Sequence, residues 1–160
     1  MKIRTGKRSD LNKLVPLFIQ YNKFLWGLLP KKGSFFTKPK DNFDYYIKKS
    51  VNQMISNKEH KILVAESDGE IVGTVSGWIN NHKNSLFKDK CKIGTFGYLV
   101  VKKGFQNEGI SSKLKDEIFK WFKSRKCNFV TLEVNTNNPA KKIYEKWQFK
   151  TYSEKMLIKL

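Results

Sequence analysis

Residues 99–114 read LVVKKGFQNEGISSKL, and this stretch indicates the fold more strongly than any other part of the chain. It begins in an apolar, strand-like run and ends in an amphipathic helical pattern. The turn between them holds Gly109, whose missing side chain lets an anion approach the backbone closely. The first N–H groups of a helix lack partners within the helix and carry partial positive charge. The stretch therefore predicts a phosphate-binding turn between a strand and a helix.

Two better-known phosphate loops do not occur in this sequence. The chain has no G-x-x-x-x-G-K-[ST] segment, which excludes a Walker loop, and no G-x-G-x-x-G dinucleotide fingerprint. Ser111 and Ser112 are small enough to keep the approach of a phosphate open, and they add two hydroxyl donors. Taken alone, a glycine before a helix is equally typical of an ordinary turn.

Three strand-like segments precede this turn. Residues 61–66 and 71–79 flank Asp68-Gly69, a dipeptide that favours a tight hairpin between two strands. Residues 93–101 form the third segment, and a polar loop over residues 80–92 separates it from the second.

The N-terminal part predicts a short strand and two helices. Residues 3–5 are strand-like, Ser9 can cap the next helix, and Pro16 predicts a kink or an early break in it. Residues 21–39 are aromatic and irregular, and a second helix is expected from about Asp41. The apolar positions at helical spacing are Leu11, Leu14, Val15, Phe18 and Ile19, then Phe43, Ile47, Val51 and Met54.

The C-terminal part continues the alternation of helices and strands. The helix after the turn has one apolar face, and residues 129–134 form a strand. Asn138 is a good N-cap for a last helix, with Pro139 as its first residue. Residues 149–152 and 156–160 can form a closing hairpin. The sequence thus predicts a mixed α/β domain. The apolar face after the turn consists of Ile110, Leu114, Ile118, Trp121 and Phe122.

The composition of the chain is strongly basic. The 160 residues carry 32 Lys and Arg against 14 Asp and Glu, a formal net charge of +18. Such a field attracts anions, and a polyanionic cofactor suits it. Nucleic-acid binding is an alternative supported by charge alone, and we do not expect it, because the lysines are scattered. Solvated lysines favoured by the proteome explain the charge equally well.

Neither membrane insertion nor secretion is expected. No apolar run approaches the ~18 residues of a membrane-spanning helix, and the N-terminus has no signal-peptide pattern. Cys91 and Cys127 lie far apart in sequence, without metal-ligand spacing. We expect two free thiols in a reducing cytoplasm, with a disulfide as the alternative.

The stretch at 99–114 resembles the acetyl-CoA-binding segment of the GNAT superfamily of N-acetyltransferases. The family pattern is Q/R-x-x-G-x-G/A after a strand, and Gln106, Gly109 and Ser111 fill its positions, with Ser111 replacing the usual Gly or Ala. The stretch from Asn137 to Phe149 is similar to the family's N-x-x-A-x-x-x-Y-E-K-x-G-F, with Gln148 in place of Gly. This last departure affects the turn after the helix.

The resemblance covers nearly the whole chain and implies a single N-acetyltransferase domain over residues 1–160. It implies a mixed, mostly antiparallel sheet of about six or seven strands flanked by about four helices. It also implies acetyl-CoA as cosubstrate, no metal, and direct attack of an amine on the thioester within a ternary complex. A homodimer is compatible with this class.

The resemblance assigns roles to particular residues. Backbone groups of the turn would hold the pyrophosphate, and the preceding strand would pair with the pantetheine arm as though it were an added strand. The N–H near Val101 would polarise the thioester oxygen, and the Asn137 amide would bind the arm. The implied cofactor-binding residues are Leu99, Val100, Val101, Gln106, Asn107, Glu108, Gly109, Ile110, Ser111, Ser112, Asn137 and Tyr144.

The sequence indicates one residue for the acid of the reaction but leaves two candidates for the base. Tyr144 occupies the position of the family's tyrosine and would protonate the departing thiolate as general acid, whereas periodicity alone is typical of a core tyrosine. Many relatives carry a base on the strand before the turn, but residues 93–101 contain no acid. Glu66 and Glu133 on neighbouring strands are the candidate bases, and proton loss to water is the alternative.

The acceptor is an amine on a small molecule, a peptide or a protein. Aromatic residues between Tyr21 and Tyr46 would wall its site or else cap the core, and the positive charge favours an acceptor that carries a carboxylate or phosphate. Alternative functions are transfer of another acyl group and a coenzyme-A-binding regulator without catalysis. The aromatic residues are Phe24, Trp26, Phe35, Phe36, Tyr45 and Tyr46.

Overall fold

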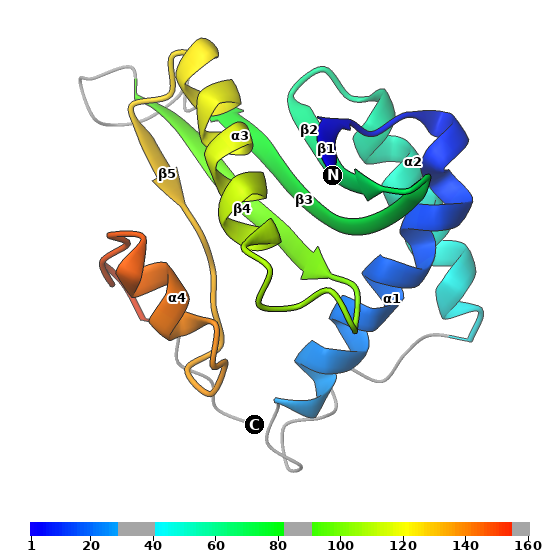
Figure 1. Ribbon diagram of the computed structural model, residues 1–160. Helices are drawn as coiled ribbons and strands as arrows, with labels where there is room; N and C mark the ends of the chain where they lie inside the picture. Colours follow the sequence, from blue (N-terminus) through cyan, green and yellow to red (C-terminus); the bar gives the residue numbers. More distant parts are fainter. Residues whose placement is uncertain (29–40, 82–90, 155–160) are drawn as a thin grey trace.

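The computed structural model describes residues 1–28, 41–81 and 91–154 (Figure 1). The order of elements follows the predicted alternation of strands and helices. The strands are β1 (Lys2–Thr5), β2 (His60–Ser67), β3 (Glu70–Asn81), β4 (Lys92–Val101) and β5 (Phe129–Thr131). The helices are α1 (Leu11–Gly27), α2 (Phe43–Ser56), α3 (Ile110–Ser124) and α4 (Lys141–Lys146), and a 3-10 turn, η1 (Arg8–Asp10), precedes α1.

The strands form one sheet in chain order, from β1 to β5. Neighbours are antiparallel except for β4 and β5, which are parallel. This confirms the mixed, mostly antiparallel sheet, although the described residues hold five strands rather than six or seven. The difference lies near the C-terminus, because β5 ends at Thr131 and residues 149–152 form no strand. The other half of the expected closing hairpin, residues 156–160, lies outside the described residues.

The two faces of the sheet are covered by different helices (Figure 1). Alternate residues of β2 show this division: Leu63 and Ala65 pack with α3, whereas Ile62 and Val64 pack with α1 and α2. This follows from the two-residue period of a strand. The helix α3 lies very close to the sheet, since a Cβ added at Gly94 would be 2.5 Å from the ring of Phe122. The predicted apolar faces of α1, α2 and α3 are thereby confirmed.

The predicted hairpin between β2 and β3 is confirmed. Asp68 and Gly69 both adopt positive φ, 50° and 76°, as a tight type I′ turn requires. The two strands are longer than predicted, and β3 runs through Asn80 to Asn81.

The start of α1 differs from the prediction. Ser9 does not cap the helix. Instead Asp10 closes the 3-10 turn, and its carboxylate accepts a hydrogen bond from the backbone N–H of Lys7 at 2.8 Å. Pro16 does not break the helix, which continues to Gly27. Because burial of Leu14 and Phe18 on both sides of the proline stabilises the helix, it tolerates one lost backbone hydrogen bond.

Candidate active site

A wedge between β4 and β5 is the main feature of the site. The two strands pair only from Ile93 to Thr95 on β4 and from Phe129 to Thr131 on β5. Beyond these pairs β4 continues to Val101, and no described strand lies along this edge. Backbone N–H and C=O groups on the open edge of a strand can pair with an extended ligand. The wedge thus offers the unpaired edge that the pantetheine arm was expected to use.

A β-bulge bends β4 where the wedge opens. Val75 of β3 faces Leu99 and Gly77 faces Phe96, so that Ser76 faces both residues between them, Gly97 and Tyr98. The buried Ser76 hydroxyl oxygen accepts the N–H of Tyr98 at 3.0 Å, which satisfies a backbone group that the bulge removes from the ladder. A bulge of this kind bends a strand and increases its twist. The bend is the physical reason why β4 separates from β5.

The turn after β4 has the geometry of an anion site. Gly104, Asn107 and Gly109 all adopt positive φ, of 93°, 69° and 74°, which folds the chain tightly between β4 and α3. Gly109 is the N-cap of α3, and no side chain caps it. A Cβ at Gly109 would have nothing within 4 Å. The space beside Gly109 is therefore open, and no side chain caps the first N–H groups of α3, as expected of a phosphate-binding turn.

The predicted cofactor-binding residues between 99 and 112 follow one continuous path along the chain, whereas Asn137 precedes α4 and Tyr144 lies within it. Residues 99–101 form the free end of β4, and residues 106–112 form the turn and the first turn of α3. Gln106, Asn107 and Glu108 are exposed, while Ile110 is buried against the sheet and anchors the turn.

Gln20 of α1 fixes the end of this path and was not predicted from the sequence. Its side-chain Nε2 donates to the carbonyl oxygen of Val101 at 3.1 Å. The bond joins α1 to the last residue of β4, immediately before the phosphate turn. A polar residue on a mainly apolar helix gives little signal of such a role, because its partner lies far away in the chain.

Tyr144 of α4 lies in an aromatic cluster. Its ring centroid is 6.2 Å from that of Phe96 on β4 and 5.8 Å from that of Trp147. Burial raises the pKa of the Tyr144 phenol above its ordinary value of 10.0. The phenol therefore carries its proton throughout the neutral range and can donate it.

Tyr21 and Tyr98 add two phenols on the other face of β4. Their ring centroids are 4.9 Å apart in an edge-to-face arrangement. Burial raises the pKa of Tyr21 to about 12, and Tyr144 and Tyr98 contribute to this rise. Tyrosines from α1 and β4 thus contact each other beside the bend of β4. Tyr98 was not predicted from the sequence, since strand alternation does not place it correctly when a bulge shifts its phase.

The stretch before α4 departs from the prediction. The helix begins at Lys141, with Ala140 as its N-cap, rather than at Pro139 with Asn138 as the cap. Asn138 is buried, and its side-chain oxygen accepts the N–H of Ala140 at 2.9 Å, so that it shapes the turn instead. Asn137 is exposed beside it.

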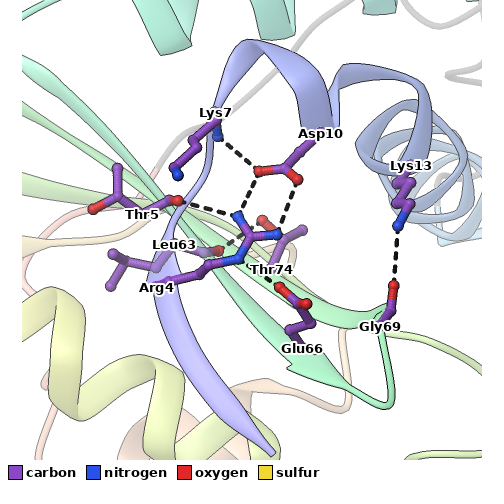
Figure 2. Close-up of polar contacts among 9 residues, drawn as sticks. All are labelled: Arg4, Thr5, Lys7, Asp10, Lys13, Leu63, Glu66, Gly69 and Thr74. Atoms are coloured by element: carbon purple, nitrogen blue, oxygen red, sulfur yellow. Dashed lines mark hydrogen bonds and ion pairs between the residues drawn. The ribbon is translucent and has the colours of Figure 1, made fainter.

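The two candidate bases have different surroundings. Glu66 lies on β2, two strands away from β4, and its Oε2 is 2.5 Å from Nε of Arg4. The same guanidinium binds both carboxylate oxygens of Asp10 at 2.6 and 2.9 Å (Figure 2). Hydrogen bonding to Arg4 lowers the pKa of Asp10. Glu66 thus belongs to a network that joins β1, η1 and β2, whereas the exposed Glu133 follows β5 at the wedge.

The aromatic residues expected at the acceptor site are only partly described. Trp26 and Phe43 join the ends of α1 and α2, with ring centroids 4.7 Å apart. A pocket at the start of α2 is lined by residues 42–46, including the exposed Tyr45 and Tyr46. Phe35 and Phe36 lie outside the described residues.

Two kinds of feature are absent from the part of the chain that the structure describes. No helix there is both long and apolar enough to cross a membrane. Within the same residues, no three His, Cys, Asp or Glu side chains gather where they could hold a metal ion.

Comparison with known proteins identifies the family. Residues 25–149 match the acetyltransferase (GNAT) family, and the chain belongs to this family. An uncharacterized N-acetyltransferase from Archaeoglobus fulgidus is 28% identical over 145 residues, which are 90% of this chain and 89% of the relative.

Solved structures of low sequence identity share the fold. A mutant protein from Bacillus halodurans has a TM-score of 0.84 at 17% identity, over 100% of this chain and 99% of its own. A predicted acetyltransferase from Clostridium acetobutylicum, solved with acetyl-CoA, has a TM-score of 0.76 at 15% identity, over 99% and 95% of the two chains. The wedge and the turn thus lie within a fold common to these proteins.

Proposed function

We propose that this protein is an N-acetyltransferase that moves the acetyl group of acetyl-CoA onto a primary amine by direct attack in a ternary complex. The observation that carries the proposal is the open edge of β4, which leads directly into an uncapped helix N-terminus at Gly109. A thioester on an extended arm with a pyrophosphate at its other end fits this arrangement. We further propose that residues 1–160 form one domain, since a single sheet includes both β1 and β5.

Two parts of the site would bind acetyl-CoA. The backbone of Leu99, Val100 and Val101 pairs with the pantetheine arm, and the N–H near Val101 polarises the thioester oxygen. The backbone N–H groups of the turn bind the pyrophosphate, and the Asn137 amide binds the arm. The turn residues in this role are Gln106, Asn107, Glu108, Gly109, Ile110, Ser111 and Ser112. The chemistry requires no metal ion.

Tyr144 serves as the general acid in this proposal. Its raised pKa keeps the phenol protonated, so that it hydrogen-bonds the departing thiolate and gives it a proton as the carbon–sulfur bond breaks. Contacts with Phe96 and Trp147 hold the ring in place. A positioned donor requires such packing, since it must act without reorganisation.

The acceptor amine must lose a proton before it attacks. Between the two candidate bases we favour Glu133, because it follows β5 at the wedge, whereas Glu66 lies on β2, two strands away from β4. Proton loss to water is the alternative, since β4 carries no acidic residue. We expect an acceptor with a carboxylate or phosphate group, which the net charge of +18 would attract.

Calorimetric titration with acetyl-CoA tests the proposal, with NAD and ATP as controls. We expect saturable binding of acetyl-CoA at micromolar level and none of the controls. Release of the coenzyme A thiol with a panel of amines then tests for catalysis. Binding without turnover on any amine would favour a coenzyme-A-binding regulator, and absence of binding would overturn the assignment of the wedge.

A further inference from the structure

The two cysteines of the chain occupy matched positions at the closed end of the wedge. In the parallel pair of β4 and β5, Ile93 faces Phe129 and Thr95 faces Thr131, a constant offset of 36 residues. Cys91 and Cys127 have the same offset. They lie two residues before the first of these pairs.

Hydrogen bonds extend the strand pairing toward the cysteines. The backbone N–H of Asn128 donates to the carbonyl oxygen of Lys92 at 2.8 Å. In return, the N–H of Lys92 donates to the side-chain Oδ1 of Asn128 at 3.0 Å. These bonds join the residue after Cys91 to the residue after Cys127. Neighbouring strands lie about 4.8 Å apart, and a disulfide spans Cα atoms about 4.4–6.8 Å apart.

The C-terminal cap of α3 fixes Cys127. Lys126 adopts a left-handed φ of 59°, and the N–H of Cys127 donates to the carbonyl oxygen of Phe122 at 3.0 Å. This is the bond pattern of a Schellman motif, which ends a helix in a defined direction. Cys127 also packs against the core under α3. Its thiol is therefore held at one place rather than on a freely moving loop.

Both thiols are free and half-buried in this structure. Burial raises the pKa of Cys127, and the positive charges of Lys92 and Arg125 oppose this rise. Cys91 adds slightly to the rise. The reactive species in thiol–disulfide exchange is the thiolate, so a raised pKa slows the reaction, and the two cations lessen this effect.

We propose that Cys91 and Cys127 form a reversible disulfide that locks the closed end of the wedge. The oxidant is a small-molecule disulfide such as oxidised glutathione. One thiolate attacks it, which forms a mixed disulfide and releases one glutathione thiolate. The second cysteine then attacks the mixed disulfide, and the second glutathione leaves. The protein loses two protons and two electrons, and one oxidised glutathione takes them up to become two reduced ones.

The position of the bond determines its effect. It joins the strands on the side of the Ile93–Phe129 pair that lies away from the open part of β4, so it leaves the edge at residues 96–101 unobstructed. It closes a loop that contains α3 and the phosphate turn. Such a link restricts the unfolded chain, and we expect it to raise Tm by about 5–15 °C. We expect acetyl-CoA affinity to change less than about twofold.

The test uses the full chain, incubated with oxidised glutathione and then measured by intact mass and peptide mapping. We expect loss of two hydrogens, a 91–127 cross-linked peptide, the rise in Tm, and reversal of all three by a reducing agent. The variants Cys91→Ser and Cys127→Ser serve as matched controls. Each should take up one glutathione or none and show no rise in Tm.

A further variant tests whether the pairing of Lys92 with Asn128 positions the two cysteines. Asn128→Ala removes the side-chain acceptor of the Lys92 N–H and leaves both thiols in place. We expect the disulfide in this variant to form about 3–10-fold more slowly than in the wild type, because the two strand starts are held together less firmly. Bonds between two chains, glutathione on both cysteines, or two unreacted thiols in the wild type would each overturn the proposal.

Discussion

The hydroxyl of Tyr144 is the single group on which the proposed acid catalysis depends. Replacement by Phe keeps the ring that packs on Phe96 and Trp147, and it removes only the proton donor. We expect Tyr144→Phe to lower kcat by about 10–100-fold, within the range typical of a lost general acid. The Kd for acetyl-CoA should change little.

The pH profile separates a catalytic role of Tyr144 from a packing role. Because burial raises the pKa of this phenol above 10.0, the acid form persists below that pH, and kcat should fall only above it. Tyr152, which is 79% exposed, provides the matched control, and Tyr152→Phe should leave kcat unchanged. Wild-type turnover in Tyr144→Phe would limit this residue to packing.

Gln148 stands at the end of α4 in a conformation that favours glycine. Its φ is 68°, and the N–H of the next residue, Phe149, donates to the carbonyl oxygen of Tyr144 at 3.0 Å, as in a Schellman motif. The turn thus keeps the geometry of the family's glycine despite the substitution. We expect Gln148→Gly to raise the free energy of unfolding by about 0.5–1 kcal/mol, because it relieves a left-handed φ.

Denaturant unfolding measures this gain, with the same substitution in a helix as control. Gln53 is exposed within α2, and Gln53→Gly should lower the free energy of unfolding by about 1 kcal/mol. A loss of similar size in both variants would contradict the role assigned to the φ of Gln148.

Single residues differ in how far the sequence reveals them. Gly109 could be predicted because its requirement is local: a positive φ before a helix. The position of Tyr98 could not be predicted, since the bulge opposite Ser76 gives two successive residues of β4 a single partner and so interrupts the strand alternation. The roles of Gln20 and Glu66 also depend on partners, Val101 and Arg4, that lie more than 60 positions away in the chain.

The start of α3 is the element on which cofactor binding depends. Gly109→Glu would place a carboxylate at the uncapped N–H groups and strain a φ of 74°. We expect it to abolish measurable acetyl-CoA binding in calorimetry, because charge and bulk oppose the pyrophosphate. Gly69 is the matched control, with a φ of 76° and equally open surroundings in the β2–β3 turn. Gly69→Glu should bind acetyl-CoA normally, and equal affinity in both variants would refute the phosphate site.

Asp10 connects three elements through Arg4 and the backbone of Lys7 (Figure 2). Asp10→Asn leaves a partly buried guanidinium with only Glu66, and we expect a loss of about 2–3 kcal/mol in unfolding free energy at pH 7. The folded pKa of Asp10 is lowered by Arg4, so its contribution is present above pH 3.8 and is lost as the pH falls through the folded value.

The difference between wild type and Asp10→Asn should therefore shrink below about pH 4. Asp116→Asn is the control, since Asp116 is 58% exposed and pairs with Lys115 at the surface. That variant should lose less than about 1 kcal/mol at any pH. A constant difference for Asp10→Asn across the acid range would contradict the ion-pair explanation.

Elements were predicted best where periodicity and turn chemistry agree. The β2–β3 hairpin and the apolar faces of α1, α2 and α3 satisfy both criteria. The start of α1 was predicted wrongly, because Asp10 has a tertiary partner, Arg4, that outweighs the local preference for Ser9 as a cap. Of the two alternatives at Pro16, a kink or an early break, the break does not occur, since burial of Leu14 and Phe18 outweighs the local cost of the proline.

At the scale of the whole molecule, strand order required the family resemblance. Local patterns indicate hairpins, but the parallel pairing of β5 with β4 across α3 joins segments 36 residues apart. The wedge arises from this pairing together with the bulge, and neither leaves a periodic pattern. The net charge, in contrast, follows directly from composition, and its effect on function can be tested.

A net charge of +18 should strengthen the binding of a polyanionic cofactor from a distance. We expect the Kd for acetyl-CoA to rise about 3–10-fold between 0.05 and 0.5 M salt, because the screening length falls severalfold over this range. Calorimetry at both salt concentrations measures this. Lys48→Glu with Lys49→Glu, two exposed changes on α2, should weaken binding at low salt and match the wild type at high salt. A Kd independent of salt would mean that contacts in the turn alone hold the phosphates and that the charge acts elsewhere.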